Sequence, residues 1–292
     1  MLKTSVFIRQ NKNSVQGFSK QNGWTILSEI ESRIKAKIDA IGTPLKEWDI
    51  NINYGIKTGF NEAFIIDNVQ KEYILKNCPE AAEIIRPILL GRNIKRYRHS
   101  WENTWIINTH NGIKGREDKI NVEKDYPGVY EYLKTFKPDI EKRFDQGAHW
   151  TNLRNCAYLM DFEKPKIAWG NLALKTQFAY IEEPMFINAP SPFFVTEKRY
   201  LLAILNSKLA DFYIKKLGVT RNGGYFEYKP MFIEQLPVPD ISKEHEELLL
   251  GLLSKNPEHN HEIEILIDQM VYEIYDLDLN EIAFLDNSVN SQ

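Results

Sequence analysis

The chain has 292 residues, of which 43% are hydrophobic and 26% are charged, so its composition is that of an ordinary globular protein. The length suits one large domain or two smaller ones, and the formal net charge of −3 gives no sign of a polyanionic partner. No segment approaches the ~18 uninterrupted apolar residues of a membrane span, which argues against a membrane-bound protein. Cys78 and Cys156 fit unpaired thiols in a reducing compartment, so we expect a cytoplasmic protein.

The first half of the sequence predicts short elements joined by irregular segments. Residues 1–22 are polar and fit an edge strand or a linker. Isoleucines spaced four apart predict a helix over residues 25–40, which Gly42 and Pro44 end. The next expected elements are, in chain order, a strand at 48–54, a turn at 55–61, a strand at 63–66 and helices at 79–85 and 129–145.

The second half predicts strands first and helices afterwards. Aromatic and β-branched residues predict strands at 165–169, 177–181, 192–195 and 225–228, and apolar periodicity predicts helices at 198–216, 243–253 and 260–275. Strands and helices mix without a regular βαβ order. This arrangement predicts the α+β class, with a mixed, mostly antiparallel sheet, packed helices and a C-terminal helical segment.

Motifs for cofactor binding and catalysis are missing from the sequence. No two of the 15 glycines are separated by exactly one residue, which excludes the G-x-G loop of dinucleotide and methyl-donor sites. No two of the 13 prolines are adjacent, which excludes the N-P-P-Y and D-P-P-Y tetrapeptides that amino-methyltransferases use to hold a flipped base. No Cys or carboxylate lies at metal-binding spacing from His259 and His261. We therefore interpret this pair as solvent-exposed residues at the start of a helix. We therefore expect no catalytic residue, metal or cofactor in this chain.

The net charge averages two unlike parts of the sequence. Residues 240–292 hold 13 acidic and 2 basic side chains, which leaves 35 basic and 27 acidic side chains in residues 1–239. Basic charge is densest in residues 86–116, where seven lysines and arginines and three large aromatic residues accompany a single acid, Glu102. The asymmetry indicates a basic module followed by an acidic helical segment.

Six segments in this order carry a family resemblance. They are Tyr54–Asp67 (YGIKTGFNEAFIID), Pro87–Tyr97 (PILLGRNIKRY), Lys164–Ile167 (KPKI), Leu201–Leu209 (LLAILNSKL), Glu234–Pro239 (EQLPVP) and Ile267–Tyr275 (IDQMVYEIY). Together they resemble the C-terminal specificity region of type IIG restriction–modification enzymes and adenine-N6 DNA methyltransferases, the TaqI-like specificity domain. The Asn-Ser-Lys and Leu-Pro-x-Pro elements are also similar to those of target-recognition domains in type I specificity subunits.

The resemblance implies a module that recognises a sequence in double-stranded DNA. In that family an adenine-N6 methyltransferase, and often an endonuclease, precedes this region, so S-adenosylmethionine, and Mg²⁺ where a nuclease is present, would belong to the parent protein. The alternative is a specificity subunit that docks a separate methyltransferase subunit through its C-terminal helices. The expected domains are an N-terminal linker and helix (1–46), a DNA target-recognition domain (47–239) and an acidic helical segment (240–292).

DNA recognition needs cations for phosphates, and arginine or amide side chains for base edges. Within the resemblance, we expect these contacts from Lys57, Thr58, Asn61, Arg92, Asn93, Lys95, Arg96, Arg98, Arg116, Arg154, Arg221 and Asn222. Each segment also has a structural interpretation: an ordinary glycine turn at 55–61, a solvated basic loop at 92–98 and a polar turn at 221–224.

A further polar cluster lies in a segment with little periodicity. Arg143, His149, Asn152 and Arg154 fit a recognition loop, because such loops carry binding residues on a rigid scaffold. The same residues also fit a structural loop capped by Trp150, and this interpretation is the favoured one.

Overall fold

The computed structural model describes residues 14–15, 26–113, 115–116, 118–218 and 220–289. They pack into two compact units, and each is described by itself. Unit 1 comprises Met1–Asn51, Leu172–Gln177 and Lys198–Gln292, and unit 2 comprises Ile52–Asn171 and Phe178–Glu197. Most of the predicted N-terminal strand or linker lies outside the described residues. The expected domain boundaries after residues 46 and 239 stay predictions.

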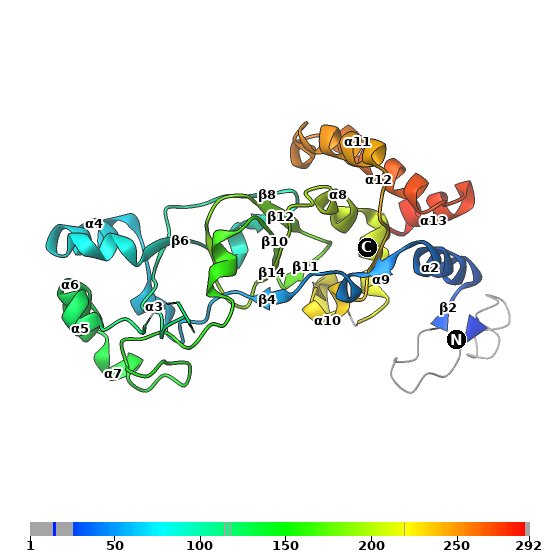
Figure 1. The fold of residues 1–292 in the computed structure, drawn as a ribbon. Coiled ribbons are helices and arrows are strands. Elements are labelled where there is room, and N and C mark those ends of the chain that lie inside the picture. Colours follow the sequence, from blue (N-terminus) through cyan, green and yellow to red (C-terminus); the bar gives the residue numbers. More distant parts are fainter. Residues whose placement is uncertain (1–13, 16–25, 114, 117, 219, 290–292) are drawn as a thin grey trace. The chain divides into compact units, whose positions relative to one another are not determined.

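Unit 2 is built on two four-stranded sheets (Figure 1). The first is antiparallel throughout and has the order β12-β10-β14-β4, in which β10 pairs with strands on both of its sides. The second has the order β13-β6-β9-β5, with one parallel pair between β13 and β6. Their bounds are β4 Ile52–Tyr54, β5 Ile65–Ile66, β6 Ile85–Leu89, β9 Trp105–Ile107, β10 Lys166–Trp169, β12 Phe178–Ile181, β13 Phe186–Ile187 and β14 Pro192–Val195.

Runs of apolar residues explain why these strands form the core. All four residues of β10 are buried, as are three of the four in both β12 and β14, so these strands are covered on both faces. Phe162 stacks on Phe186 with ring centroids 4.6 Å apart and lies 4.8 Å from Phe193, which joins the two sheets in one hydrophobic cluster. The predicted strands at 165–169, 177–181 and 192–195 therefore agree with the structure.

The helices of unit 2 differ more from the sequence expectations. Residues 63–66, expected as a strand, divide between the short helix α3 and β5, and the helix expected over 129–145 breaks into separate helices. The helix α4 was not anticipated, because only Ile74 of its ten residues is buried and its sequence is mostly polar. The helices are α3 Asn61–Phe64, α4 Asn68–Asn77, α5 Val122–Asp125, α6 Pro127–Lys134 and α7 Lys137–Ile140, with 3-10 turns at Pro79–Glu83, Gly91–Asn93 and Leu159–Glu163.

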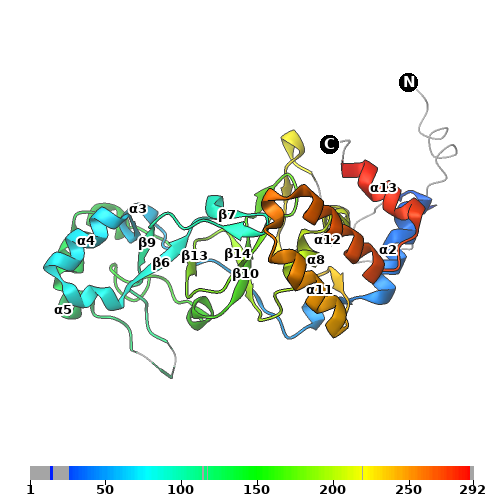
Figure 2. The same ribbon diagram turned by 90° about the horizontal axis from the view of Figure 1, so that it is seen from above.

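Unit 1 is mainly helical and carries three two-stranded ladders (Figures 1 and 2). Its helices are α2 Glu29–Ile41, α8 Leu201–Asn206, α9 Lys208–Lys215, α10 Pro230–Ile233, α11 Lys243–Leu253, α12 His261–Ile274 and α13 Leu279–Val289. Its strands are β1 Ser14–Val15, β2 Ile26–Leu27, β3 Thr43–Pro44, β11 Leu172–Ala173, β15 Phe226–Glu227 and β16 Pro237–Val238, with 3-10 turns at Leu45–Glu47, Asn222–Gly224 and Pro257–His259. A reciprocal capping box between Ser28 and Glu31 begins α2.

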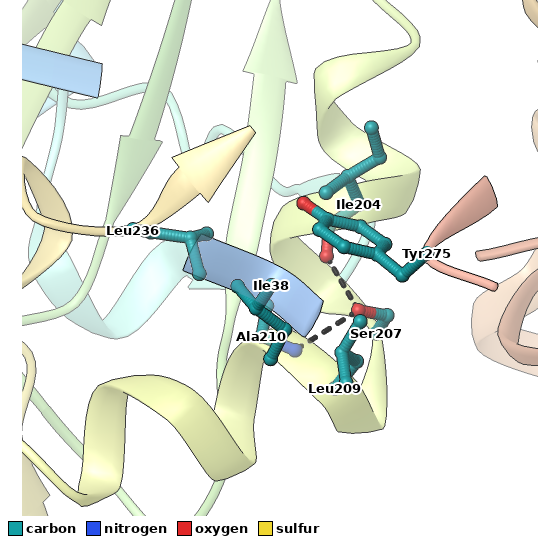
Figure 3. A pocket seen from close by; sticks show the side chains of 7 residues that line it. All are labelled: Ile38, Ile204, Ser207, Leu209, Ala210, Leu236 and Tyr275. Carbon is teal, nitrogen blue, oxygen red and sulfur yellow. Dashed lines mark hydrogen bonds between the residues drawn. The ribbon is translucent and has the colours of Figure 1, made fainter. Parts of the chain in front are cut away.

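The helix expected over 198–216 is two helices divided at Ser207. The Ser207 hydroxyl donates to the Ile204 carbonyl (2.7 Å) and accepts from the Ala210 amide (3.1 Å), so it closes α8 and caps α9 (Figure 3). The apolar pocket beside it has no room for a water molecule. This pocket is therefore part of the packing of unit 1.

Three helices, rather than the two expected, form the C-terminal segment. α11 has the predicted bounds and α12 begins and ends within one residue of them, whereas α13 was not anticipated. α12 packs on α8 and α9, and α13 packs on α9 and α2.

The predicted α+β class, with mostly antiparallel sheets and packed helices, is confirmed. Among the described residues, no helix combines the length and apolar character that crossing a bilayer requires.

Lys166, at the start of the central strand β10, is fully buried. Its ammonium donates to the Glu183 carbonyl at 3.3 Å, and burial lowers the pKa of Lys166 to about 8. In the unfolded chain the pKa returns to about 10.4. Between these values the unfolded chain holds a proton that the folded chain has lost, so Lys166 makes the free energy of unfolding rise with pH over this interval.

Replacing Lys166 with Met tests this titration. We expect the difference in free energy of unfolding between the variant and the parent chain to change by about 2 kcal/mol between pH 7 and pH 10, in favour of the parent at high pH. Burial raises the pKa of Cys156 to about 11, so this thiol makes the free energy of unfolding fall with pH. Cys156 is present in both chains, so its contribution cancels when their free energies of unfolding are subtracted. Urea unfolding at several pH values measures the difference, and a pH-independent difference would contradict a buried, titrating Lys166.

Candidate nucleic-acid interface

The turn between β4 and α3 lies in unit 2 and contains three of the predicted site residues. Lys57 and Asn61 are exposed, whereas Thr58 is only 1% exposed. The Thr58 hydroxyl donates to Asn61 Oδ1 at 2.6 Å and accepts from the Phe60 amide, so it holds the turn together from inside. Gly59 takes a φ of +72°, a conformation that favours glycine. Lys57 and Asn61 are thus presented to solvent on a fixed backbone.

Segment Asn188–Ser191 connects this turn to the basic segment that follows β6. The Gly55 amide donates to the Ser191 carbonyl (2.8 Å) on one side, and the Asn188 amide donates to the Leu89 carbonyl (2.9 Å) on the other. A Cβ at Gly55 would lie 2.5 Å from the carbonyl of Ile187, so only glycine allows this close approach. Two segments far apart in the sequence are therefore held against the segment Asn188–Ser191, which connects β13 to β14.

The basic segment itself ends in a tight hairpin of β7 Ile94–Lys95 and β8 Arg98–His99. Lys95 pairs with Arg98 across the ladder, and both side chains are exposed, while Ile94 beneath them is 1% exposed. Directly opposed residues of a ladder point to the same face, so the hairpin presents two cations together. Its strands pack on β10 and β12 in the core of unit 2.

The two residues at the tip of the hairpin are anchored. Tyr97 takes a φ of 67°, and its amide donates to the Phe178 carbonyl at 2.8 Å. The Arg96 guanidinium lies 4.8 Å from the centre of the Tyr97 ring, a cation–π contact that fixes the direction of this half-buried side chain. The hairpin is thus a firm support for the cations around it.

Arg92 and Asn93 precede the hairpin and differ in exposure. Arg92 is exposed and lies 3.7 Å from Glu102, an exposed ion pair of little energetic weight. Asn93 is 4% exposed, and its backbone carbonyl accepts from the Ser100 amide. Arg92 is therefore available to an anion, whereas the Asn93 side chain is enclosed by its own unit.

Arg143 ties the loop 141–155 to the turn 55–61. This side chain is 6% exposed, and its guanidinium donates to the backbone carbonyls of four residues. They are Ile140 (3.0 Å), Trp150 (2.7 Å), Asn152 (3.2 Å) and Thr58. Burial lowers the pKa of Arg143 to about 10, which leaves the group charged at neutral pH. Its role is to hold backbone together, as the structural interpretation of this loop proposed.

Asn152 joins the same loop to the loop 108–121, which carries Arg116. The buried Asn152 amide donates to the carbonyls of Ile120 (2.9 Å) and His110 (3.2 Å). Asn111 reinforces the junction, because its carbonyl oxygen accepts from the Ala148 amide at 2.8 Å. Arg116 is exposed between the two anchored parts of this loop.

Arg154 and His149 are the two exposed residues of the predicted polar cluster. Arg154 makes an ion pair of 2.7 Å with Asp145, and the His149 Nδ1 lies 2.8 Å from the Thr151 hydroxyl. The four polar residues of this predicted cluster therefore divide into two that are buried and structural, Arg143 and Asn152, and two that solvent reaches.

Arg221 and Asn222 belong to unit 1, whereas the other ten predicted residues belong to unit 2. Both are exposed at the 3-10 turn Asn222–Gly224, where Gly223 and Gly224 have positive φ angles of 73° and 80°. Arg221 makes an ion pair of 3.1 Å with Glu227.

Unit 2 therefore holds a chain of mutually braced segments, which we call the basic segments: 55–61, 91–99, 108–121 and 141–155. Of the predicted site residues, these segments expose the cations Lys57, Arg92, Lys95, Arg98, Arg116 and Arg154, and they also expose Lys119 and Lys142. Such an arrangement can bind several phosphates without reorganising its backbone. Sequence patterns indicated the cations but missed the braces, Asn111 and segment Asn188–Ser191, because these act through contacts distant in sequence. Within the described ranges, no three His, Cys, Asp or Glu side chains gather as metal ligands would.

Comparison with solved structures finds proteins of similar fold. Among solved structures, the type IIL restriction-modification enzyme MmeI in complex with DNA is similar, with a TM-score of 0.62 and 13% identity over 87% of this chain and 37% of that chain. The type IIG restriction endonuclease BpuSI has a TM-score of 0.49 and 14% identity over 85% of this chain and 34% of that chain. The chain thus spans little more than a third of the MmeI chain. No curated protein matches the sequence.

The family model of the TaqI-like C-terminal specificity domain matches residues 86–238, over half of the chain. The matched range includes three of the four basic segments and the core strand β10. It also confirms the resemblance inferred from the six sequence segments. The chain belongs to the family of TaqI-like C-terminal specificity domains.

Proposed function

We propose that the chain is the DNA sequence-recognition module of a restriction–modification enzyme. The observation that carries the proposal is the set of braced basic segments, which lies largely within the matched specificity domain. MmeI, whose fold is similar, is described in complex with DNA, which supports the same ligand here. The exposed cations would bind phosphates, and the arginines among them could also read guanine edges in the major groove.

The module would position duplex DNA for adenine-N6 methylation by domains that precede it in a longer protein. Such a methyltransferase must flip its target adenine, so the module would hold the flanking base pairs while the stack opens. S-adenosylmethionine, and Mg²⁺ where the parent also cleaves, would bind to those preceding domains. The family resemblance supports this part of the proposal, as does the short span of the chain relative to MmeI.

A second candidate is a subunit that docks a separate methyltransferase through its C-terminal helices. The acidic helices α11 and α12 favour it, because they expose Leu248 (48%) and Leu266 (44%) beside their carboxylates. Reading the genomic sequence upstream of Met1 separates the candidates. An N-P-P-Y motif in the same reading frame supports a fused enzyme, and a separate methyltransferase gene supports the subunit.

Salt dependence of duplex binding tests the proposed function. If the basic segments contact about six phosphates, the logarithm of the association constant should fall with the logarithm of salt concentration at a slope near −5. Fluorescence anisotropy with a labelled mixed-sequence duplex, measured between about 50 and 200 mM salt, gives the slope. Undetectable binding, or binding insensitive to salt, would contradict the proposal.

A further inference from the structure

Phe144 is the most exposed large hydrophobic side chain among the described residues. It is 99% exposed, compared with 75% for Val69 and 84% for Leu279. A phenylalanine in this position makes almost no contact within its own unit, although burying an aromatic side chain is strongly favourable. Packing of the described residues thus gives no reason for an aromatic residue here.

The backbone that carries Phe144 is braced on both sides. Arg143 immediately before it is the buried guanidinium that donates to four backbone carbonyls, and Asp145 immediately after it pairs with Arg154 at 2.7 Å. Gln146 forms a bridge with Leu153, which closes the loop behind them. The exposed ring therefore projects from a fixed backbone, so binding has to order only the rotamer of the side chain.

The surroundings of Phe144 are those of a nucleic-acid site. A Cβ built on Gly59 would lie 2.9 Å from the Asp145 carbonyl, so the turn that carries Lys57 packs directly against the Phe144 loop. Lys142, on the other side of Phe144, is also exposed. The nearest chain neighbours of the ring are polar or charged, unlike the apolar surroundings that a protein-docking site would offer.

We propose that Phe144 packs against a nucleobase of the bound duplex, as a wedge between base steps or as a stacking platform for an unstacked base. The inference rests on the proposed DNA-recognition function and adds a contact to it. Proteins that distort DNA insert apolar side chains at base steps, and aromatic rings stack on any base. Phosphate contacts from Lys57 and Arg154 would bring the duplex to the ring, and the braced loop would hold the ring against the base.

The test compares Phe144→Ala with the matched control Val69→Ala, which also removes an exposed apolar side chain from unit 2. The probe is the duplex that the unsubstituted chain enriches from a random library. We expect Phe144→Ala to weaken binding about tenfold. The slope of affinity against salt should stay unchanged because the contact is not ionic. Val69→Ala should bind like the parent, and Phe144→Trp should restore affinity because it keeps a stacking ring.

Three results would overturn the inference. The first is equal affinity of Phe144→Ala and the parent chain. The second is a loss of affinity that comes with a lower melting temperature, since a fully exposed side chain should not affect stability. The third is failure of Phe144→Trp to restore binding. If the unsubstituted chain binds no duplex at all, the proposed function itself fails, and that outcome is distinct from a silent Phe144 variant.

Discussion

Replacing Arg92, Lys95 and Arg98 together with alanine is expected to weaken duplex binding about 500-fold at 0.1 M salt. These three exposed cations stand on and beside the anchored hairpin of β7 and β8. Each phosphate contact releases about 0.9 counterion, so three lost contacts should also make the salt slope shallower by nearly three. Fluorescence anisotropy across a range of salt concentrations measures both changes.

A matched triple substitution separates local contact from bulk charge. Lys76, Lys124 and Lys134 are exposed on α4, α5 and α6, helices that gather at the end of unit 2 away from the hairpin (Figures 1 and 2). Replacing them with alanine removes the same charge and should change affinity far less. Equal losses in the two triple variants would show that only net charge matters, and the hairpin would lose its assigned role.

Replacing Arg143 with Met is expected to lower the free energy of unfolding by about 4 kcal/mol. The substitution keeps much of the apolar stem but removes every donor that the guanidinium supplies. The Thr58 and Trp150 carbonyls would then lose this donor in a buried setting, which is more costly than losing a solvated hydrogen bond. The Ile140 and Asn152 carbonyls would lose one of two donors, since each also accepts from a backbone amide. Urea unfolding followed by tryptophan fluorescence measures the change.

Arg154→Met is the control for Arg143→Met, because both remove an arginine from the same loop. Arg154 keeps 55% of its side chain exposed and pairs with Asp145 at the surface, so its loss should cost at most about 1 kcal/mol. If the Arg143 variant is as stable as the Arg154 variant, the guanidinium does not brace the loop, and the fixed backbone assigned to Phe144 would be lost with it.

Much of the fold follows from local sequence patterns. The helix 243–253 was predicted with its observed bounds, and the core strands near 166–169, 178–181 and 192–195 were predicted within one residue at their ends. These segments combine strong periodicity or dense apolar residues with clear ends. α4 escaped detection because its mostly polar sequence buries little, and its capping box between Asp67 and Gln70 was the signal overlooked.

The candidate site was predictable only in part. The excess of basic residues in 86–116 pointed to Arg92, Lys95 and Arg98, which the structure places at the surface. Composition does not distinguish them from Asn93, which the unit encloses, because burial depends on contacts with segments far away in sequence. Phe144 illustrates the same limit, since a phenylalanine in a polar loop is usually expected to turn inward.

Selection of bound sequences from a random duplex library tests the central claim most directly. The chain, alone and within its longer parent protein, is incubated with duplexes of random sequence, and the retained molecules are sequenced over several rounds. Sequence recognition by this module predicts that both proteins enrich the same short motif, and that replacing Arg92, Lys95 and Arg98 abolishes the enrichment. Binding without any enriched motif, or a motif enriched by the parent but unaffected by these substitutions, would contradict the claim.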